Sequence, residues 1–373
     1  MELKIKEVES RSELRLFIRF PDHLYKGCTY YVPPLHKQQF ETLSADKNPA
    51  FDHCEARYWL AYQGDELVGR IAGIINYRYN EEQQVRQIRF GWLDFRDDER
   101  VAKALLAKIE AWGQQKNMTA IHGPLGFTSF DPSGVLVEGF DEWPSSFGRY
   151  NYAYYNDHLQ NNGYTKDVDW LEYNVKVPEL FPERVKKLAE VVKKRFALRN
   201  APIHTKKDIE NYAGSILEMI NTIYQDIYSF STLTNKQIHT LGQEFVSLIH
   251  PDYVSVIVND TNEPVAFGLA IHSLAKALKK AGGSLYPFGW LHIYRALKKN
   301  DTVDLLLIGV MPAYQNKGAH ALVFEKMGHS FIKNHIKQLE TTRELEHNRK
   351  VQQLWEGYEK RQHKRARCYI KNI

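Results

Sequence analysis

Apolar and polar positions along the chain are spaced in a way that marks short strands and amphipathic helices. Residues 303–310 form a nearly continuous apolar run with the length of a strand buried on both faces. Pro312 ends this run, because proline cannot donate to a β-ladder. After the polar loop 314–318, apolar residues recur every three or four positions, which predicts a helix over residues 319–331. The stretch is therefore predicted to fold as strand, glycine loop and helix.

A similar order of elements is predicted twice along the chain: helix, hairpin, strand, helix, strand, helix, strand. In the first half the predicted elements are 14–24, the hairpin 58–62 and 67–75, 89–95, 99–112, 120–124, 154–161 and 170–177. In the second half they are a strand 195–199, 209–223, the hairpin 253–258 and 264–271, 303–310, 319–331, a helix 351–358 and a strand 366–370. The repetition predicts an internal duplication of an α/β unit with a mixed sheet.

The boundary between the two units is predicted near Pro178. This proline ends a strand, and a basic amphipathic helix over residues 181–192 follows it. We therefore expect a first domain over residues 1–178, a connecting helix over 179–193 and a second domain over 194–373. A chain of 373 residues suits two domains of this size.

The glycine loop has the features of an anion site. A helix N-terminus leaves backbone N–H groups unpaired and carries the positive end of the helix dipole, which together favour phosphate. Gly318 lets the chain approach an anion closely because it has no Cβ, and Lys317 adds a positive charge nearby. The alternative is an ordinary strand–loop–helix junction with a solvated loop.

The loop resembles the acyl-CoA-binding motif of the GNAT (GCN5-related N-acetyltransferase) superfamily. Gln315 and Gly318 match the Gln/Arg-x-x-Gly positions of that motif, whereas His320 stands where the superfamily has Gly or Ala. The resemblance implies that backbone N–H groups of the loop hold the pyrophosphate of acetyl-CoA or another acyl-CoA. The coenzyme-binding residues implied in this way are Val310, Gln315, Asn316, Lys317, Gly318, Ala319 and Asn348.

The resemblance extends over nearly the whole chain. The order of elements in both halves matches the GNAT order, and the chain resembles bacterial proteins that are built as two GNAT-like domains in tandem. The motifs that carry this likeness are Asn48-Pro49, Val68 to Ala72, Gly123-Pro124, Tyr154-Tyr155, Leu345-Glu346-x-Asn348 and Arg365-x-Arg367-x-Tyr369-x-Lys371. The implied fold is α/β with two tandem GNAT-like domains.

Only the second half has a candidate coenzyme loop. At the equivalent turn the first half offers Asp97, Asp98 and Glu99 and no glycine. These carboxylates suit a helix start but repel a pyrophosphate. We expect the second half to bind coenzyme and the first half to shape the substrate side.

The activity implied by the resemblance is acyl transfer from acyl-CoA to an amine, of a small molecule or a peptide. Asp304 and Glu346 are candidate general bases, and the backbone N–H near Val310 is a candidate donor to the thioester oxygen. The superfamily often has a tyrosine acid where this chain has Trp355, so Tyr358, expected on the same helix face, is the substitute candidate. The alternative without catalysis is that Asp304 and Glu346 are solvated or helix-capping carboxylates and that Tyr358 is a partly buried packing residue.

Two other functions remain open at this stage. The departure at Trp355 favours a non-catalytic module that has kept the fold as a ligand sensor or scaffold. Tandem GNAT-like domains also resemble aminoacyl transferases that use aminoacyl-tRNA to build cell-wall peptides. The net charge of +5 is mild and fits an anionic small molecule without implying nucleic acid.

The remaining composition narrows the setting. Cys28, Cys54 and Cys368 have no framework spacing, so we expect free thiols in a reducing compartment. The charged start has no signal-peptide core, and no apolar run approaches the roughly 20 residues that span a bilayer. We therefore expect a cytoplasmic protein without a membrane partner, and without a metal because the histidines show no ligand spacing. The aromatic clusters 150–155 and 286–290 are expected to pack in a core or at the domain interface, or to line a substrate pocket between the domains.

Overall fold

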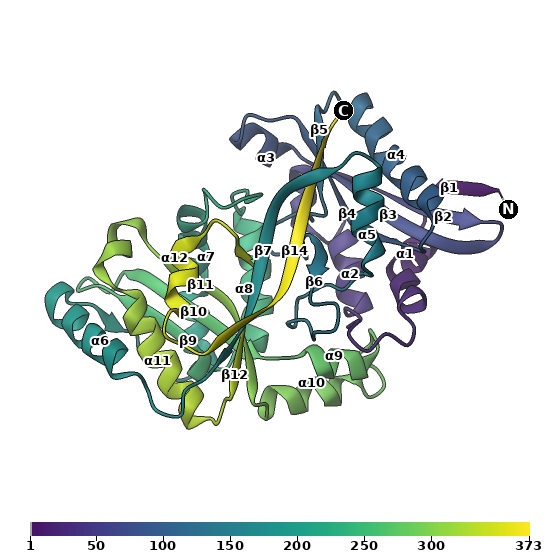
Figure 1. Ribbon diagram of the computed structural model, residues 1–373. Helices are drawn as coiled ribbons and strands as arrows, with labels where there is room; N and C mark the ends of the chain where they lie inside the picture. The colour runs from purple at the N-terminus through teal and green to yellow at the C-terminus, as the bar shows by residue number, and fades with distance from the viewer. Residues whose placement is uncertain (1) are drawn as a thin grey trace.

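The computed structural model describes residues 2–373 and has the mixed α/β architecture that the sequence predicts. A single 14-stranded sheet runs through the molecule in the order β1-β2-β3-β4-β5-β14-β7-β12-β11-β10-β9-β8, with β13 and β6 beside this path. Helices cover both faces of the sheet in each half (Figure 1). Within residues 2–373, none of the helices combines the length and apolar character that crossing a bilayer requires.

The strands are β1 (Leu3–Glu7), β2 (Cys54–Gln63), β3 (Glu66–Asn76), β4 (Gln87–Phe95), β5 (Ala120–Gly123), β6 (Val135–Glu138), β7 (Thr165–Lys176), β8 (Arg199–Asn200), β9 (Val254–Val258), β10 (Pro264–His272), β11 (Thr302–Val310), β12 (Gln338–Thr341), β13 (Glu344–Leu345) and β14 (Lys360–Asn372). The helices are α1 (Arg11–Leu24), α2 (His36–Leu43), α3 (Tyr77–Glu82), α4 (Glu99–Gln115), α5 (Tyr154–Asn161), α6 (Glu183–Phe196), α7 (Lys206–Ile223), α8 (Asn235–Leu248), α9 (Ala275–Ala281), α10 (Gly289–Lys298), α11 (His320–Lys333) and α12 (Arg349–Gln352).

The two halves exchange their last strands. β14, the end of the second half, pairs with β5 of the first half, while β7, the end of the first half, pairs with β12 of the second. β14 and β7 also pair with each other along most of their length and form the long central ribbon between the halves (Figure 1). The division at residues 178 and 194 stays a prediction. With that division, the sheet of each half includes one strand from the other half.

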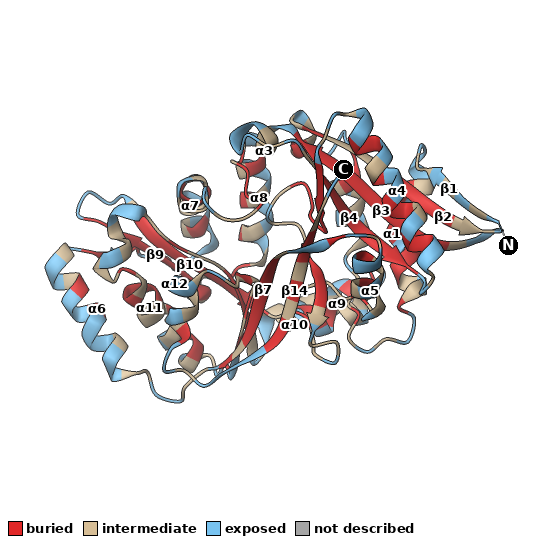
Figure 2. Ribbon diagram, turned by 45° about the horizontal axis from the view of Figure 1, so that its top comes forward, coloured by how far each residue is buried: buried red, intermediate tan, exposed pale blue. Residues whose placement is uncertain are grey.

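Side chains of β3 show why the sheet is covered on both faces. Ile71 and Ile75 point into the cluster under α4, whereas Ala72 and Ile74 point into the cluster under α1. Successive strand residues face opposite sides of a sheet, so a continuous apolar run is needed when both sides are covered. The central strands are accordingly buried along their length (Figure 2).

A β-bulge interrupts β11, the strand that leads to the glycine loop. Leu306 is an extra residue there, and the register with β10 shifts around it. Val303 and Leu305 face the cluster under α11 before the bulge, and Ile308 and Val310 face the same cluster after it. One inserted residue therefore reverses the alternation along the strand, as bulges do, and such bulges are frequent beside active sites.

Two predicted elements of the second half are wrong. The predicted strand 195–199 is the end of α6, which runs to Phe196 and stops at Ala197 in the left-handed conformation; only Arg199–Asn200 is strand. Basic residues in the last turn of α6 interact favourably with the negative end of the helix dipole, which favours helix rather than strand at this position. The predicted helix 351–358 is the short α12 followed by a 3-10 turn, Gln353–Trp355, because Gly357 turns the chain at a φ of +83°.

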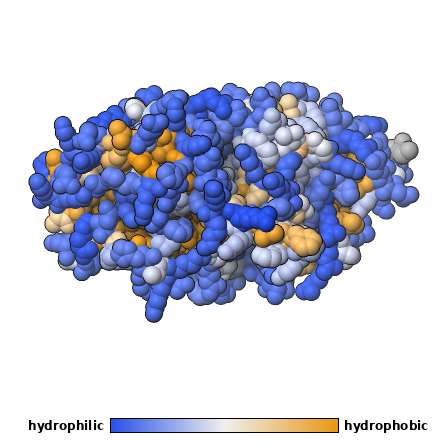
Figure 3. Space-filling view, turned by 90° about the horizontal axis from the view of Figure 1, so that it is seen from below, coloured by the Kyte–Doolittle hydropathy of each residue, from blue (hydrophilic) through white to orange (hydrophobic). Residues whose placement is uncertain are grey.

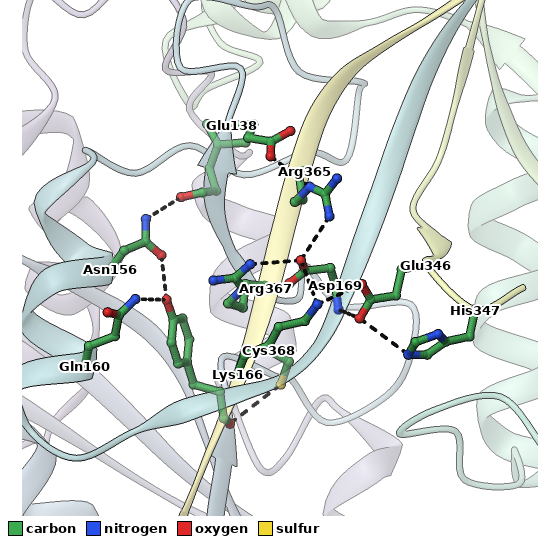
Figure 4. Close-up of polar contacts among 12 residues, drawn as sticks. Glu138, Asn156, Gln160, Lys166, Asp169, Glu346, His347, Arg365, Arg367 and Cys368 are labelled. Carbon is green, nitrogen blue, oxygen red and sulfur yellow. Dashed lines mark hydrogen bonds and ion pairs between the residues drawn. The ribbon is translucent and has the colours of Figure 1, made fainter.

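A buried ion cluster holds the two exchanged strands together. Asp169 on β7 is fully buried and accepts from Arg367 at 2.7 and 3.0 Å and from Arg365 at 3.2 Å, both on β14. Lys166 lies 3.2 Å from the same carboxylate and 2.8 Å from Glu346. Figure 4 shows these side chains converging between the two ribbons. Glu346, Arg365 and Arg367, which belong to the two motifs of the second half that carry the family resemblance, therefore meet at Asp169.

The charge of Asp169 depends on these partners. Burial alone raises the pKa of this carboxyl, but hydrogen bonds from Arg367, Lys166 and Arg365 outweigh burial, so the pKa lies below its ordinary value. A carboxyl with a lowered pKa stabilises the fold at pH values above its unfolded pKa, and this contribution is lost as the pH falls through the native pKa.

We predict that Asp169→Asn lowers the free energy of unfolding by about 3 kcal/mol at pH 7, because it leaves partly buried cations without their counter-charge. Urea denaturation at pH 7 measures the loss. The difference from wild type should shrink as the pH falls below the ordinary pKa of an aspartate, because the unfolded chain then binds a proton that the native carboxyl resists.

Asp157→Asn, on the exposed side of α5, is the matched control and should change stability by less than about 0.5 kcal/mol. An equally small effect of Asp169→Asn would show that the ion cluster does not hold the exchanged strands.

Candidate functional site

The glycine loop has the geometry that the sequence predicts. β11 ends at Val310, a 3-10 turn follows over Pro312–Lys317, and Gly318 takes a φ of +77° before α11 begins. Ala319 occupies the N-cap of α11 and supplies no side-chain cap. The N-terminus of α11 is therefore free of a competing side-chain acceptor, which suits an anion.

Other loop residues play more local roles. Gln315 donates to the carbonyl oxygen of Val310 at 3.4 Å and accepts from Lys350 at 3.4 Å, which joins the loop to α12. Asn316 is exposed. The ammonium of Lys317 lies 4.5 Å from the centre of the Tyr314 ring, so this charge is held against an aromatic face.

Two structural features favour glycine at position 318, and neither can be read from the sequence. Its positive φ favours glycine, and a Cβ there would lie 3.0 Å from Cγ2 of Val192 on the connecting helix α6. The loop is thus packed against α6 on the side where a Gly318 side chain would point. Substitution of Gly318 would disturb this packing as well as any bound anion.

The equivalent turn of the first half is occupied by a side-chain cap. Asp98 caps α4 by accepting from the backbone N–H of Arg100 at 2.9 Å. The space between β4 and β5 is crossed by the chain itself, since Leu125 donates to the carbonyl oxygen of Phe90 at 2.8 Å. A Cβ at Gly91 would lie only 2.4 Å from the carbonyl oxygen of Leu125. β4 and the segment after β5 therefore stay in contact beyond the last paired residues of the two strands.

A large cavity lies between the halves and takes walls from both; we call it the central cavity. Its volume is about 700 Å³. The second half supplies a mainly apolar wall: Leu241, Phe245, Leu248, Leu274, Leu278, Ile293 and Leu305 to Ile308. The first half supplies a more polar wall from residues 128–133 and 145–150. The cavity reaches the bulge of β11 and the residues after β12, where these two parallel strands separate.

Two buried carboxylates that the sequence did not single out line the central cavity: Glu172, which accepts from Arg343, and Glu344. Glu344 has no cationic partner within the described residues. It lies on β13, is 8% exposed and accepts from the indole N–H of Trp355 at 2.7 Å. Its other oxygen, Oε2, has no hydrogen-bond partner among residues 2–373. Burial raises the pKa of Glu344 to about 7, while the Trp355 hydrogen bond opposes that rise. A carboxyl with this pKa is suited to proton transfer near neutral pH.

Arginines bring positive charge to the same cavity. Arg70 is paired with Asp94 at 2.6 Å, and Arg343 donates to Glu172 at 3.3 Å. Arg149 lines the cavity over the Trp92 ring, at 5.6 Å, and takes no ion pair among the described residues. Burial lowers the pKa of Arg149, and the neighbouring Arg70 and Arg343 act in the same direction. Two of the three arginines that line the cavity are therefore paired with carboxylates, and Arg149 is not.

Asp304, a predicted base, is fully buried in β11 and joins the halves. Its Oδ2 accepts from the backbone N–H of Ser146 at 2.8 Å and from the Ser146 hydroxyl, whose oxygen accepts from the N–H of Leu274 at 2.6 Å. Burial raises the pKa of Asp304 to about 6 despite these bonds. Ser146 lines the central cavity, whereas Asp304 lies behind that wall.

Glu346 and Asn348 lie apart from Asp304. Glu346 belongs to the ion cluster, where it accepts from Lys166 at 2.8 Å and from the backbone N–H of Asp169 at 3.1 Å (Figure 4). Burial tends to raise the pKa of Glu346, but these bonds bring it below its ordinary value, which weakens it as a base. Asn348 lines the cavity and caps α12 by accepting from the N–H of Val351 at 3.3 Å.

Tyr358 does not share a helix face with Trp355, contrary to the expectation. The helix ends at Gln352, so Tyr358 lies in the bend before β14 and packs against the cluster under α11. Burial raises its pKa. Its assignment as the acid stays a prediction, and Trp355 acquires a role that the sequence did not suggest, as the donor to Glu344.

The structure thus brings together residues that no motif connects. Glu344 and Asn348 line the central cavity, and Trp355 lies behind Glu344 as its hydrogen-bond donor. Lys350, two residues after Asn348, contacts Gln315 of the glycine loop. Glu344 could not be predicted from the sequence, because it differs from other strand glutamates only in its hydrogen bond from Trp355 and its place in the cavity wall. Among residues 2–373 no group of three or more metal-ligating side chains occurs, and the three cysteines are unpaired.

Comparisons with known proteins agree with this architecture. No protein-family model matches the chain. The structure is similar to a solved tandem GNAT protein from the clavulanic acid biosynthesis pathway, with a TM-score of 0.58 at 11% identity over 100% of this chain and 98% of that one. It is also similar to the glucosamine N-acetyltransferase region of a fungal multi-domain β-N-acetylglucosaminidase, with a TM-score of 0.55 at 10% identity over 99% of this chain and 38% of that one.

The protein therefore has a tandem GNAT fold, as the sequence predicts. Among sequences, the Escherichia coli (strain K12) protein YghO is 30% identical over 371 residues, 98% of this chain and 94% of YghO. The chain belongs to the family of YghO. A Caulobacter vibrioides (strain NA1000 / CB15N) protein named bacterial ceramide synthase is 26% identical over 326 residues, 84% of this chain and 82% of that protein.

We predict that Trp355→Phe raises the pKa of Glu344 further above 7, because it removes the hydrogen bond that stabilises the charged form. The carboxyl stretching band in infrared pH titration reports this pKa, and Glu344→Gln identifies the band. Since the folded pKa is raised, charging Glu344 costs stability as the pH rises through 7, and Glu344→Gln should gain relative to wild type over that range.

Trp112→Phe is the matched control, because Trp112 is equally buried but in the first-half core away from Glu344. If Trp355→Phe and Trp112→Phe give the same midpoint in the pH titration of Glu344, the indole of Trp355 does not set the proton affinity of this carboxyl.

Proposed function

We propose that this protein is an acyl-CoA-dependent N-acyltransferase that acylates the primary amine of a long-chain acceptor held in the central cavity. The observation that carries the proposal is a buried carboxylate with an unpaired oxygen, Glu344, in an otherwise mainly apolar cavity that reaches the separated ends of β11 and β12. An apolar cavity with few polar groups is the usual form of a small-molecule site.

The acyl-CoA would lie on the second half. The uncapped N-terminus of α11 and the turn at Gly318 suit its pyrophosphate, and the bulge at Leu306 suits the thioester because bulges leave backbone groups outside the ladder. Val310, Gln315, Asn316, Lys317 and Ala319 stay predicted contacts of the coenzyme.

The acceptor class rests on the cavity and on one relative. A ceramide is the fatty amide of a long-chain amino alcohol, so the name of the Caulobacter vibrioides relative implies a long-chain amine as its acceptor. A cavity of about 700 Å³ lined by Phe245, Leu278 and Ile293 has room for such a chain. The peptide amines and small amines of the wider superfamily would leave this apolar wall exposed to water.

Glu344 would act as the general base. Its carboxylate takes one proton from the ammonium of the acceptor, and the free amine attacks the thioester carbonyl carbon. The C–N bond forms as the C–S bond breaks, and the second proton of the nitrogen passes to the departing sulfur. Trp355 would orient the carboxylate through its 2.7 Å hydrogen bond, and Ser146 and Asp304 would hold the opposite wall.

The test is thiol release from palmitoyl-CoA with sphinganine as the acceptor. We expect wild-type turnover, a rate that falls as the pH drops through about 7, and a loss of at least about 100-fold in kcat for Glu344→Gln, which is the scale of general-base catalysis. Propylamine should be a much poorer acceptor, since it leaves the apolar wall unfilled.

Glu346→Gln decides between the two carboxylates. We expect it to lower kcat by less than about threefold, because Glu346 is held by Lys166 outside the cavity wall; the reverse order would make Glu346 the base. Release of no thiol with any amine, although CoA still stabilises the protein against heat, would favour the ligand sensor or scaffold. Acceptance of aminoacyl-tRNA would favour the third alternative.

A further inference from the structure

The segment that joins β10 to β11 carries an unusual charge. Residues 273–300 contain six basic side chains and no acidic one, a net charge of +6, whereas the whole chain has +5. The rest of the chain is therefore close to neutral. The basic residues are Lys276, Lys279, Lys280, Arg295, Lys298 and Lys299. We call this segment, with α9, α10 and their linker, the basic hairpin.

The outer face of the basic hairpin exposes aromatic rings. Tyr286 is 81% exposed, Phe288 70%, Tyr294 54% and Trp290 50%. Together with Leu285 they are five of the eleven exposed large hydrophobic side chains among residues 2–373. The expectation that the cluster 286–290 packs in a core or pocket is therefore wrong. Figure 3 shows the side on which α9 and α10 lie in Figure 1; the surface there is mixed, and its largest hydrophobic group lies at the left end, away from these two helices.

The inner face of the same hairpin forms part of the cavity wall. Leu274, Leu278 and Ile293 line the central cavity. The hairpin is fixed to the first half as well, since Lys279 donates to the carbonyl oxygens of Cys28 and Tyr31, at 2.5 and 2.9 Å. One short element therefore separates the cavity from the exposed aromatic surface.

Five of the six cations of the basic hairpin are exposed and have no acidic partner within the described residues. Lys279 is engaged with the first half, and the exposed five are Lys276, Lys280, Arg295, Lys298 and Lys299. On α10, Trp290 and Tyr294 share one face with Lys298 by their four-residue spacing. Aromatic and basic side chains are thus presented together.

We infer that the basic hairpin docks this protein on the surface of an anionic lipid bilayer. Tyr and Trp settle at the membrane–water interface because their rings are amphipathic, and clustered Lys and Arg are attracted to anionic head groups. The inference departs from the expectation of no membrane partner. It rests on the proposed function for its purpose: a long-chain amine leaving the bilayer could enter the cavity past Leu274, Leu278 and Ile293.

Two other occupants fit the surface less well. A second copy of the chain related by a twofold axis would bring one +6 segment against another, which costs binding energy. Single-stranded nucleic acid stacks on aromatics along a basic groove, whereas Tyr286 and Phe288 are 81% and 70% exposed on a short linker. An anionic bilayer satisfies both the rings and the charges.

The experiment is sedimentation of the full-length protein with large unilamellar vesicles. We expect vesicles with 30 mol% phosphatidylglycerol in phosphatidylcholine to bind at least 20-fold more tightly than pure phosphatidylcholine. The double variant Tyr286→Ser/Phe288→Ser and the double variant Lys280→Glu/Lys298→Glu should each weaken this binding at least tenfold. All four side chains are exposed, so the fold should be kept, and circular dichroism checks this.

Leu180→Ser, at an 85% exposed leucine before α6, and Lys103→Glu/Lys108→Glu on α4 are the matched controls and should bind as wild type does. Equal binding to both vesicle types, normal binding by the hairpin variants, or loss of binding in Leu180→Ser would overturn the inference. So would tRNA binding that displaces the vesicles, or a dimer that the hairpin variants abolish. Vesicle binding without acyl transfer to sphinganine would instead remove the proposed function and leave the docking surface in place.

Discussion

The pairing of β14 with β7 is the interaction on which the rest of the structure depends. These two strands are the last strands of their halves, and each continues the sheet of the other half. Their contact is fixed by the buried carboxylate of Asp169, whose charge is matched by Arg365 and Arg367 from the partner strand. Removing either strand would open an edge in both halves, so the two units fold as one sheet.

The strand exchange also places the functional features beside one another. β7 and β13 meet at the central cavity, where Glu344 lies, and the bulge of β11 forms the facing wall. A carboxylate buried in this setting is poorly solvated, and this cost is what raises its pKa into the range of proton transfer. The basic hairpin closes the same cavity toward the surface, so substrate entry, acyl transfer and surface docking would share one wall.

How far the sequence predicts this molecule differs between its parts. Long periodic segments such as those that became α4 and β11 were predicted, because burial on one or both faces leaves a clear pattern. The bulge at Leu306 and the strand exchange were not, since pairing between residues far apart leaves no local signal. The strand, glycine loop and helix could be predicted because their pattern is local; that this loop binds phosphate stays a prediction. Glu344 could not be predicted, because its environment comes from Trp355 and from a cavity wall built by distant segments.

The central claim is that one acyl-CoA binds per chain, on the second half, beside a cavity shared by both halves. Hydrogen exchange with and without CoA, combined with calorimetric stoichiometry, tests this claim most directly. The account predicts one CoA per chain and slowed exchange over residues 311–322, with unchanged exchange over residues 96–102 at the capped start of α4. Two molecules per chain, or protection at the start of α4 instead of α11, would contradict it.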